Sequence, residues 1–513
     1  MKIFNLQHLT GLRPFDKGLP TVDAPALPLP VLGEYDVVVV GGGTAGAPAG
    51  IGAGRRGAKT LLVEYLYGLG GVGTLGMIGK YWYGNRVGFT SEHDKGVEAL
   101  GASVHVVGKR EWWRRENRAA GVEMWFGAMA CGAVVRDGRV AGVVVATPQG
   151  RGVVLAKDVV DATGNADIAA AAGARCSFLG AGEIALQGAG LSERRLGESY
   201  INSDWGYVND GDAVDQWLFA LRARAGAAYG TWDISQATES RERRRIVGAV
   251  TVSPLDVVNG RTFPDTIVQG RSDFDSHGPS VDDICYVSEA NGQKIYGVNV
   301  PYRSILPETM DGLAVVGLGI SAHRDALPLM RMQPDVQNAG YAAGVAAAMA
   351  AEKGPELRAS DVKALQRHLV EKGVIPEEVL SWKDNAGVDT ERWLTAVRDM
   401  GDGYKGVSIV LSDPARALPA LREAYAKATV PSARLVYAHV LGILGDATGA
   451  ETLAGQVSGR DPQITINAKG LAAFGRRMPE RDSFIVALEI GRASRLGTGN
   501  SVKRASAFPG ALP

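Results

Sequence analysis

Four residues near the amino terminus have the types and spacing of a dinucleotide site. Gly41, Gly43 and Gly46 form the pattern G-x-G-x-x-G, and the acidic Glu64 follows them. In this pattern the first glycine permits a tight turn, the second lets backbone approach a pyrophosphate, and the third lets a helix pack closely on a strand. A carboxylate at the position of Glu64 can accept hydrogen bonds from ribose hydroxyl groups.

The elements that must position these residues can be predicted from the same stretch. The apolar run 37–40 predicts a strand, the Ala/Gly-rich segment after Gly46 predicts a helix, and the run 61–63 predicts a second strand. A strand, tight turn, helix and strand is the context that makes the glycine pattern informative. The alternative is an ordinary βαβ unit that binds nothing.

The composition of the 513-residue chain limits the classes of protein to consider. Lys+Arg and Asp+Glu both number 55, so there is no net charge to attract nucleic acid or an anionic membrane. The 3 cysteines are isolated and form no zinc or disulfide pattern, which favours a reducing compartment. No apolar run is long enough to span a bilayer, and the start of the chain lacks the apolar core of a signal peptide. We therefore expect a cytoplasmic protein.

A second glycine-rich segment, residues 68–76, follows Glu64 and implies another close approach of backbone to a ligand. Gly70, Gly71 and Thr74 match a G-G-x-x-[ST] motif. With this motif the chain resembles the bacterial FAD-dependent oxidoreductases of the glutathione-reductase and fumarate-reductase flavoprotein type. The resemblance implies FAD as the cofactor, with this segment against its diphosphate and flavin ring. The alternative is a flexible loop.

The next block, residues 121–175, has two features that the family shares. Alternating apolar positions around Asp137-Gly138 predict an antiparallel hairpin, and the run 159–161 predicts a buried strand that ends in a turn of small residues. In the family, a strand at the position of Ala130 lays its backbone against the adenine, and the Ala-Thr-Gly turn lies beside the dinucleotide. The alternative for this turn is a plain strand end.

Residues 301–354 resemble the family's return to the flavin domain. A strand predicted at 313–316 ends in glycines, and Pro334 begins a helix rich in small residues. A helix N-terminus at the pyrimidine edge of the flavin would stabilise negative charge there. The sequence departs from the family pattern at Leu318, where the family has an arginine, and at His323, which follows Ala322 directly.

The residues that we expect to contact FAD come from these segments of the chain. They are Gly41, Gly43, Thr44, Ala45, Gly46, Glu64, Gly70, Gly71, Thr74, Ala130, Ala162, Thr163, Gly164, Gly319, Gln333 and Pro334.

Candidate catalytic residues lie near and between the cofactor segments. The arginine cluster at 241–245 suits a carboxylate or another oxyanion, because guanidinium groups bind such anions bidentately. A surface helix with internal ion pairs is the alternative. In the segment 275–277 a carboxylate stands next to a histidine and could tune its basicity, although a structural histidine explains the pattern equally well. The candidates are His323, Arg324, Arg331, His277 and Arg241.

We expect an α/β fold with a Rossmann-type FAD-binding domain, built from a parallel sheet and a β-meander. An α+β cap domain is inserted into it, and an α-helical module follows. The predicted boundaries are 1–33 for an extended lead-in, 34–175 and 301–354 for the FAD-binding domain, 176–300 for the cap, and 355–513 for a HEAT-like helical module.

Motifs that the sequence lacks narrow the expected chemistry. There is no CxxC, as in disulfide reductases, and no second glycine motif for NAD(P)H. We therefore expect an FAD-dependent dehydrogenase or oxidase that moves a hydride between a small polar organic substrate and flavin N5, with a histidine taking a proton and an arginine holding an anionic group. One alternative is a fumarate-reductase-like enzyme. Another is an FAD-binding structural protein that acts through a protein partner, or through a second copy, bound to its helical tail.

Overall fold

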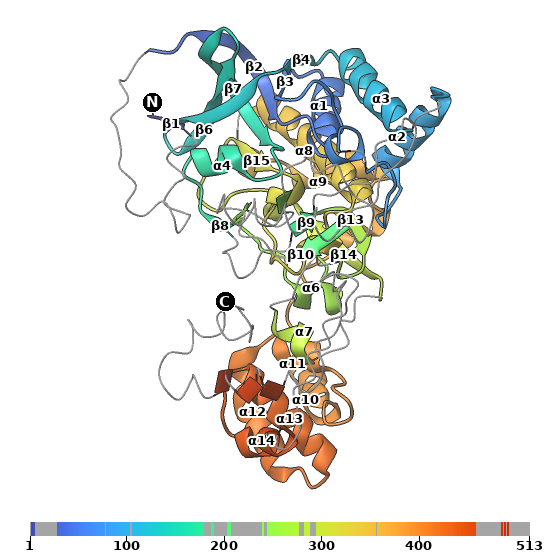
Figure 1. Ribbon diagram of the computed structural model, residues 1–513, viewed down its shortest axis with the longest axis vertical. Coiled ribbons are helices and arrows are strands. Elements are labelled where there is room, and N and C mark those ends of the chain that lie inside the picture. Colours follow the sequence, from blue (N-terminus) through green and yellow to red (C-terminus); the bar gives the residue numbers. More distant parts are fainter. Residues whose placement is uncertain are drawn as a thin grey trace. The chain divides into compact units, whose positions relative to one another are not determined.

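The computed structural model describes residues 2–5, 28–76, 78–102, 105–178, 186–188, 203–206, 239–240, 244–275, 282–287, 294–354, 356–457, 484–485, 487–488 and 490–491. The chain divides into two compact units (Figure 1). The first comprises Met1–Val252, Thr262–Ser272 and Gly297–Lys383, and the second comprises Ser253–Arg261, Asp273–Tyr296 and Asp384–Pro513.

The first unit is built on one mixed sheet with the strand order β1-β5-β6-β7-β2-β3-β4, in which β15 also pairs with β7. Strands β15, β7, β2, β3 and β4 run parallel, and β6, β5 and β1 continue the sheet as an antiparallel meander. The predicted combination of a parallel sheet and a β-meander is confirmed. The strands are β1 (Lys2–Asn5), β2 (Val31–Val40), β3 (Thr60–Glu64), β4 (Glu123–Phe126), β5 (Met129–Arg136), β6 (Arg139–Thr147), β7 (Gly150–Asp161) and β15 (Leu313–Val315).

Strand β7 joins the parallel and antiparallel parts because it is long enough to serve both. Residues 150–155 pair with β6 and residues 159–161 pair with β15, whereas residues 153–161 pair with β2. In register, Val40 and Val315 both lie opposite Asp161. The carboxyl ends of β2, β7 and β15 therefore meet at one edge, where parallel sheets commonly bind ligands.

Helices α1 (Gly46–Arg55) and α8 (Gln333–Lys353) pack closely against each other. A Cβ atom on Gly340 would overlap the carbonyl oxygen of Ala45, and one on Gly344 would overlap that of Ala49. The small residues predicted in this helix thus let it lie directly on the backbone that follows β2. Helix α8 begins as predicted, with a proline in its first turn.

Shorter elements complete the first unit. Helix α9 belongs here rather than to the helical module, because the side chain of Gln366 donates to the carbonyl of Thr266, and the Tyr302 hydroxyl donates to the carbonyl of Leu357. These elements are α2 (Gly88–Ala99), α3 (His105–Ala119), α4 (Asp167–Ala171), α9 (Val362–Glu371), β8 (Cys176–Phe178) paired with β12 (Arg244–Ile246), β13 (Thr266–Ser272) paired with β14 (Tyr296–Pro301), and β9 (Leu186–Gly188) between β10 (Ser203–Gly206) and β11 (Glu239–Ser240).

The second unit is helical, and its buried core includes Trp393, Met400, Leu421 and Leu441. The predicted helical character of this part of the chain is confirmed for the described residues between 390 and 457, whereas the likeness to HEAT repeats stays a prediction. None of the described helices is long and apolar enough to cross a membrane. The helices are α6 (Pro254–Val258), α7 (Asp283–Val287), α10 (Thr390–Asp399), α11 (Val407–Leu411), α12 (Pro414–Lys427), α13 (Pro431–Ile443) and α14 (Ala450–Val457).

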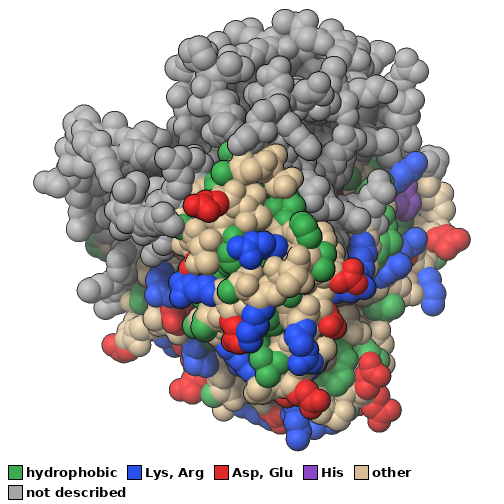
Figure 2. Space-filling model, turned by 90° about the horizontal axis from the view of Figure 1, so that it is seen from below, with side chains coloured by type: hydrophobic (Ala, Val, Ile, Leu, Met, Phe, Trp, Pro, Cys, Tyr) green, Lys and Arg blue, Asp and Glu red, His purple; other side chains and the backbone are tan. Residues whose placement is uncertain are grey.

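The charged side chains are mixed in sign on the face of the molecule drawn in Figure 2. Lysine and arginine side chains there are interspersed with aspartate and glutamate and with apolar side chains. This distribution agrees with the equal numbers of basic and acidic residues in the sequence.

Candidate functional site

The turn after β2 has the geometry that the glycine pattern predicts. Gly41 has a φ of +88°, and a Cβ atom there would lie 2.6 Å from the carbonyl oxygen of Ala162. A Cβ atom on Gly46 would overlap the carbonyl oxygen of Gly41. Gly43 differs, because among the described residues a Cβ atom on it would meet only the Cα of Gly71, at 3.9 Å. The protein itself thus leaves room above Gly43, where a pyrophosphate would pass in a dinucleotide site.

The second glycine segment is fixed directly on the first. Gly70 and Gly71 have positive φ values of 97° and 54°, which favour glycine. The N–H of Gly70 donates to the carbonyl of Gly42 (2.9 Å), and the hydroxyl of Thr44 donates to the carbonyl of Gly70 (3.3 Å). The hydroxyl of Thr74 closes the segment with a 2.6 Å bond to a backbone carbonyl. The two predicted close approaches therefore form one continuous backbone surface.

Glu64 lies at the end of β3, where its carboxylate supports the glycine turn. It accepts hydrogen bonds from the backbone N–H groups of Gly42 (2.6 Å) and Leu66 (2.8 Å). Burial raises the pKa of Glu64, while these donors act in the opposite direction. Each carboxylate oxygen can accept a second bond, so a ribose hydroxyl remains compatible with this geometry. The predicted adenine contact, Ala130, follows Ala128, whose N–H donates to the carbonyl of Glu64.

The Ala162-Thr163-Gly164 turn is held in place by a buried carboxylate. Asp161 accepts hydrogen bonds from the backbone and hydroxyl of Thr163 and from two backbone N–H groups at the start of α4. Burial raises the pKa of Asp161. In the sequence Asp161 is recognisable only as the last residue of a strand, since its partners are mostly backbone groups. The turn abuts Gly41, as its contact with Ala162 shows.

The return segment, residues 301–354, also reaches the carboxyl edge of the parallel strands. Added Cβ atoms on Gly317 and Gly319 would lie 3.4 Å from the Cβ of Ala45 and 3.0 Å from that of Ala166. Gln333 lies over Gly73, and its side-chain amide donates to the carbonyl of Ile78 (2.8 Å). The predicted cofactor residues in segments 41–46, 70–74, 162–164, 317–319 and 333–334 are thus brought together at the carboxyl edge of the parallel strands. Their backbone donors, open space and acidic residue fit an FAD.

The loop between η5 (Gly317–Gly319) and α8 carries three of the predicted catalytic residues. The N–H of His323 donates to the carbonyl of Val252 (2.7 Å), which fixes this loop. Arg324 is 3% exposed, and its Nε lies 4.0 Å from Asp325 Oδ1, beyond hydrogen-bond range. Its Nη1 is buried and meets no acceptor in the described part of the chain. Arg331 is half-buried just before α8.

The remaining two catalytic candidates, His277 and Arg241, lie outside the described residues. The described end of the arginine cluster forms strand β12, so the alternative of a surface helix is wrong for residues 244–246. Because side chains alternate along a strand, Arg244 and Arg245 point to opposite faces. Arg245 donates from Nε to the carbonyl of Ala322 (3.0 Å), next to the His323 loop.

A partly buried polar network that no sequence motif indicates supports the first turns of α8. The Tyr81 hydroxyl lies 3.0 Å from Asp94 Oδ1 and accepts a 3.2 Å bond from Gln337. His93 is fully buried with its Nδ1 3.1 Å from the same Asp94 oxygen, and burial lowers the pKa of His93. Burial also lowers the pKa of Lys109 to about 8. These contacts tie the half-buried Tyr81 and the buried His93 to the protein itself.

Asp335, in the first turn of α8, is a second buried carboxylate near the predicted flavin end. It accepts hydrogen bonds from the backbone N–H groups of Asn85 (2.7 Å) and Arg271 (3.1 Å). Burial raises the pKa of Asp335 to about 7. The signal that could have pointed to it is an acidic residue directly after the proline that starts a helix.

Comparisons with known proteins identify the family whose motifs these are. The model of a family described as FAD dependent oxidoreductase matches residues 36–198 and 226–369. No protein with a curated description matches the chain.

Solved structures are similar only at low identity. A geranylgeranyl bacteriochlorophyll reductase-like protein from Thermoplasma acidophilum is 13% identical over 76% of this chain and 98% of that chain, with a TM-score of 0.32. A flavocytochrome c3 fumarate reductase is 15% identical over 63% of this chain and 79% of that chain, with a TM-score of 0.32. THI4 from Thermovibrio ammonificans is 22% identical over 29% of this chain and 66% of that chain, with a TM-score of 0.22.

Proposed function

This chain belongs to the FAD dependent oxidoreductase family, and we propose that it moves a hydride between a small, polar, anionic organic substrate and N5 of the flavin. Bound FAD supplies the redox chemistry, while the protein binds, orients and moves protons. The observation that carries this proposal is the enclosed guanidinium of Arg324, in the loop that joins η5 to the start of α8. Both of these elements border the predicted cofactor residues.

The residues proposed to hold FAD act mainly through their backbone. The turn 41–46 and the start of α1 present N–H groups to the diphosphate, and segment 70–74 lies beside them. Glu64 is proposed to bind the adenosine ribose, Ala130 to contact the adenine, and the start of α8 to face the flavin ring. These assignments rest on the family motifs and on the way the chain brings these segments together.

Arg324 is proposed to bind the anionic group of the substrate. Its guanidinium is almost fully enclosed, its Nη1 meets no acceptor in the described residues, and the carboxylate of Asp325 is too distant for a hydrogen bond. A buried guanidinium nitrogen without a hydrogen bond is costly, and a substrate carboxylate could accept a bond from Nη1. Such a pair would also orient the substrate, because its geometry is fixed. Arg331, Arg241 and His277 remain predicted contributors to this region.

His323 is proposed to exchange the substrate proton. Its Nδ1 accepts a 3.2 Å bond from the N–H of Asp325, so the neutral imidazole carries its hydrogen on Nε2. In this tautomer Nε2 donates to a substrate oxygen. To act as a base, the ring must give up the Asp325 bond or change tautomer. Because Nε2 carries the hydrogen in this tautomer, the ring is set to give a proton, and reduction of a substrate, as in fumarate reductases, is the second candidate function.

A different role is that of an FAD-binding protein acting through a partner, or a second copy, on the helical module. The described structure offers no particular feature in its favour beyond the existence of a separate helical unit. A cytoplasmic location likewise stays a prediction from the sequence.

The proposal is tested by anaerobic reduction of the FAD-loaded protein with a panel of hydroxy acids, amino acids and neutral sugars. We expect anionic members to bleach the flavin, and Arg324→Gln to raise the KM for them roughly ten- to hundredfold. Arg115→Gln is the control, because Arg115 is exposed on α3. Reduction by neutral sugars alone, or an unchanged KM in Arg324→Gln, would contradict the proposal. Bleaching by no compound, with reoxidation by fumarate instead, would favour the reductase.

A further inference from the structure

We propose that Arg244 and Asn165 complete the cofactor site by binding the diphosphate of FAD and a hydroxyl group beside it. Neither residue belongs to a glycine motif, and Arg244 comes from a strand far along the chain, β12. The inference rests on the FAD of the proposed function and adds to it a side-chain cation for the phosphates.

The glycine turn lacks such a cation. Residues 41–46 are Gly-Gly-Gly-Thr-Ala-Gly, so this segment offers only backbone N–H groups and a hydroxyl to a group with two negative charges. The start of α1 contributes only a partial positive charge. A guanidinium placed next to this turn would neutralise charge that the motif itself cannot.

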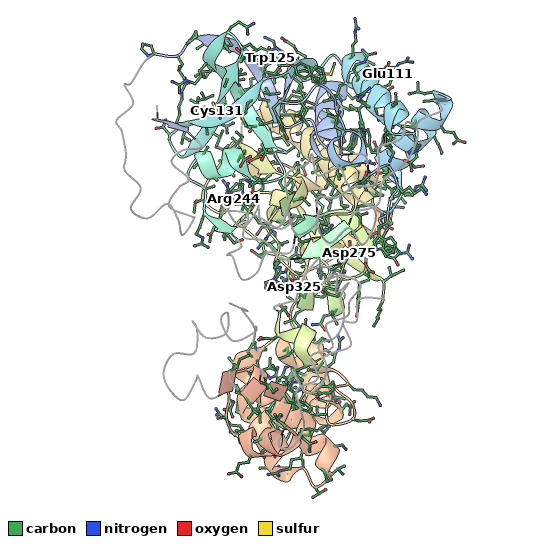
Figure 3. The ribbon with its side chains drawn as sticks, viewed as in Figure 1. Glu111, Trp125, Cys131, Arg244, Asp275 and Asp325 are labelled. Atoms are coloured by element: carbon green, nitrogen blue, oxygen red, sulfur yellow. The ribbon has the colours of Figure 1, made fainter. Side chains whose placement is uncertain are left out.

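Arg244 is buried, and two of its guanidinium nitrogens lack an acceptor among the described residues. Arg244 is labelled in Figure 3 and is 6% exposed. Its Nη2 lies 3.6 Å from Asp167 Oδ1, which is longer than a hydrogen bond. Its Nε and Nη1 are buried and meet no acceptor among the residues that the structure describes. Buried arginines are normally paired through several hydrogen bonds, so these two nitrogens point to a ligand that brings its own anionic oxygens.

Asn165 supplies a complementary acceptor beside Arg244. Its amide nitrogen donates to the same Asp167 Oδ1 (2.9 Å), and a carboxylate can only accept, so the amide oxygen must point the other way. That oxygen is buried and has no donor within the described part of the chain. An unmatched pair of donors next to an unmatched acceptor suits an anionic group with a hydroxyl close by. The diphosphate of FAD lies between ribityl and ribose hydroxyls and has this chemistry.

The place of these side chains favours the cofactor over the substrate. The turn 162–165 touches the first glycine turn, because an added Cβ on Gly41 would lie 3.2 Å from the Cα of Thr163. On the other side, β12 packs against η5, whose Gly319 lies against Ala166. An added Cβ on Gly164 would meet no atom of the described residues within 4 Å, so this part of the chain leaves the space beside the turn open.

Three other titratable groups face this pair. Asp167 shares its carboxylate between Arg244 and Asn165, so Arg244 would bridge Asp167 and the ligand. Asp161 is buried below the turn, where its two oxygens accept hydrogen bonds from backbone N–H groups and from the hydroxyl of Thr163. Burial raises the pKa of Cys176 to about 11 and keeps this thiol neutral at physiological pH. The negative charges of Asp167 and Asp161 are thus already met by donors of the protein, Asp167 by Arg244 and Asn165, and Asp161 by the turn and the start of α4.

The test is a fluorescence-quenching titration of the cofactor-stripped full-length protein with FAD and with riboflavin, which lacks phosphate. We expect Arg244→Gln to raise the Kd for FAD at least about tenfold and the Kd for riboflavin less than about threefold. Asn165→Ala should weaken FAD binding in the same direction but by less. Arg175→Gln is the matched control, since this arginine is two-thirds exposed next to β8.

Several results would overturn the inference. An unchanged Kd for FAD in Arg244→Gln, with a raised KM for an anionic substrate, would assign Arg244 to the substrate. Equal weakening of FAD and riboflavin would make Arg244 a structural residue. If the wild-type protein binds neither flavin, the proposed function fails first, which distinguishes that failure from an error about Arg244 alone.

Discussion

Replacing Gly43 by alanine should weaken FAD binding without weakening the fold. Gly43 is not among the glycines with positive φ, and in the described part of the chain the new Cβ would meet only the Cα of Gly71, at the ordinary contact distance of 3.9 Å. A substitution that creates neither strain nor overlap typically changes the free energy of unfolding by less than about 0.5 kcal/mol. The cofactor-free protein should therefore unfold at nearly the wild-type urea concentration.

In the FAD-bound protein the same methyl group would occupy space that we assign to the pyrophosphate. Overpacking of a closely fitted site costs about 1–3 kcal/mol, which corresponds to a Kd raised roughly 5- to 150-fold. The two quantities can be measured separately, by urea unfolding of the stripped protein and by fluorescence quenching of added FAD.

Gly41→Ala is the matched comparison for Gly43→Ala. Gly41 has a φ of +88°, and its added Cβ would lie 2.6 Å from a carbonyl oxygen, so this variant should lose more than about 1 kcal/mol of stability even without FAD. The reasoning is refuted if Gly43→Ala binds FAD with the wild-type Kd. It is refuted equally if Gly43→Ala destabilises the stripped protein as much as Gly41→Ala does.

Three further predictions concern stability, each measured by urea unfolding. Gly340→Ala should lower the free energy of unfolding by about 1–3 kcal/mol, because its Cβ would overlap the carbonyl oxygen of Ala45. Gly297→Ala is the control and should leave this free energy unchanged, because its Cβ would meet no described atom within 4 Å. Equal effects of the two substitutions would contradict this prediction. Burial raises the pKa of Asp335 to about 7 from 3.8. Between these two pH values the native state keeps a proton that the unfolded state loses. The contribution of Asp335 to the free energy of unfolding therefore falls as the pH rises from about 4 to about 7. Asp335→Asn should therefore gain on wild type by up to roughly 4 kcal/mol across that range, and a difference independent of pH would refute the assignment. Tyr81→Phe should lower the free energy of unfolding by about 1–3 kcal/mol, because the hydroxyl and its hydrogen bonds to Asp94 and Gln337 are lost. Tyr83→Phe is the control and should leave this free energy unchanged. An unchanged free energy of unfolding in Tyr81→Phe would show that the network contributes little.

The cofactor frame was predictable from the sequence because its signals are local. In the stretch from Gly41 to Glu64, the strand, turn and helix follow from neighbouring residues, and glycine is needed where φ is positive or where backbones touch. The return of the chain at α8 was predictable only through the family resemblance. Nothing within residues 301–354 alone specifies that Gly340 must lie on Ala45.

Arg244 could not be singled out from the sequence. A run of arginines fits an exposed helix as well as a buried strand, and the choice depends on the pairing of β12 with β8, which is remote in sequence. Asp161 and Asp335 were missed for a related reason. Their partners are largely backbone N–H groups, which every residue except proline has. No pattern of side chains in the sequence therefore predicts which N–H groups these carboxylates bind.

The central claim is that residues 41–46, 70–74 and 333–334 frame an FAD at the carboxyl edge of the parallel strands. The most direct measurement is the visible absorption spectrum of the purified full-length protein after incubation with FAD and removal of the free cofactor. We predict the bands of oxidised flavin in an amount stoichiometric with the chain. A colourless protein that cannot be reconstituted with FAD would contradict the account.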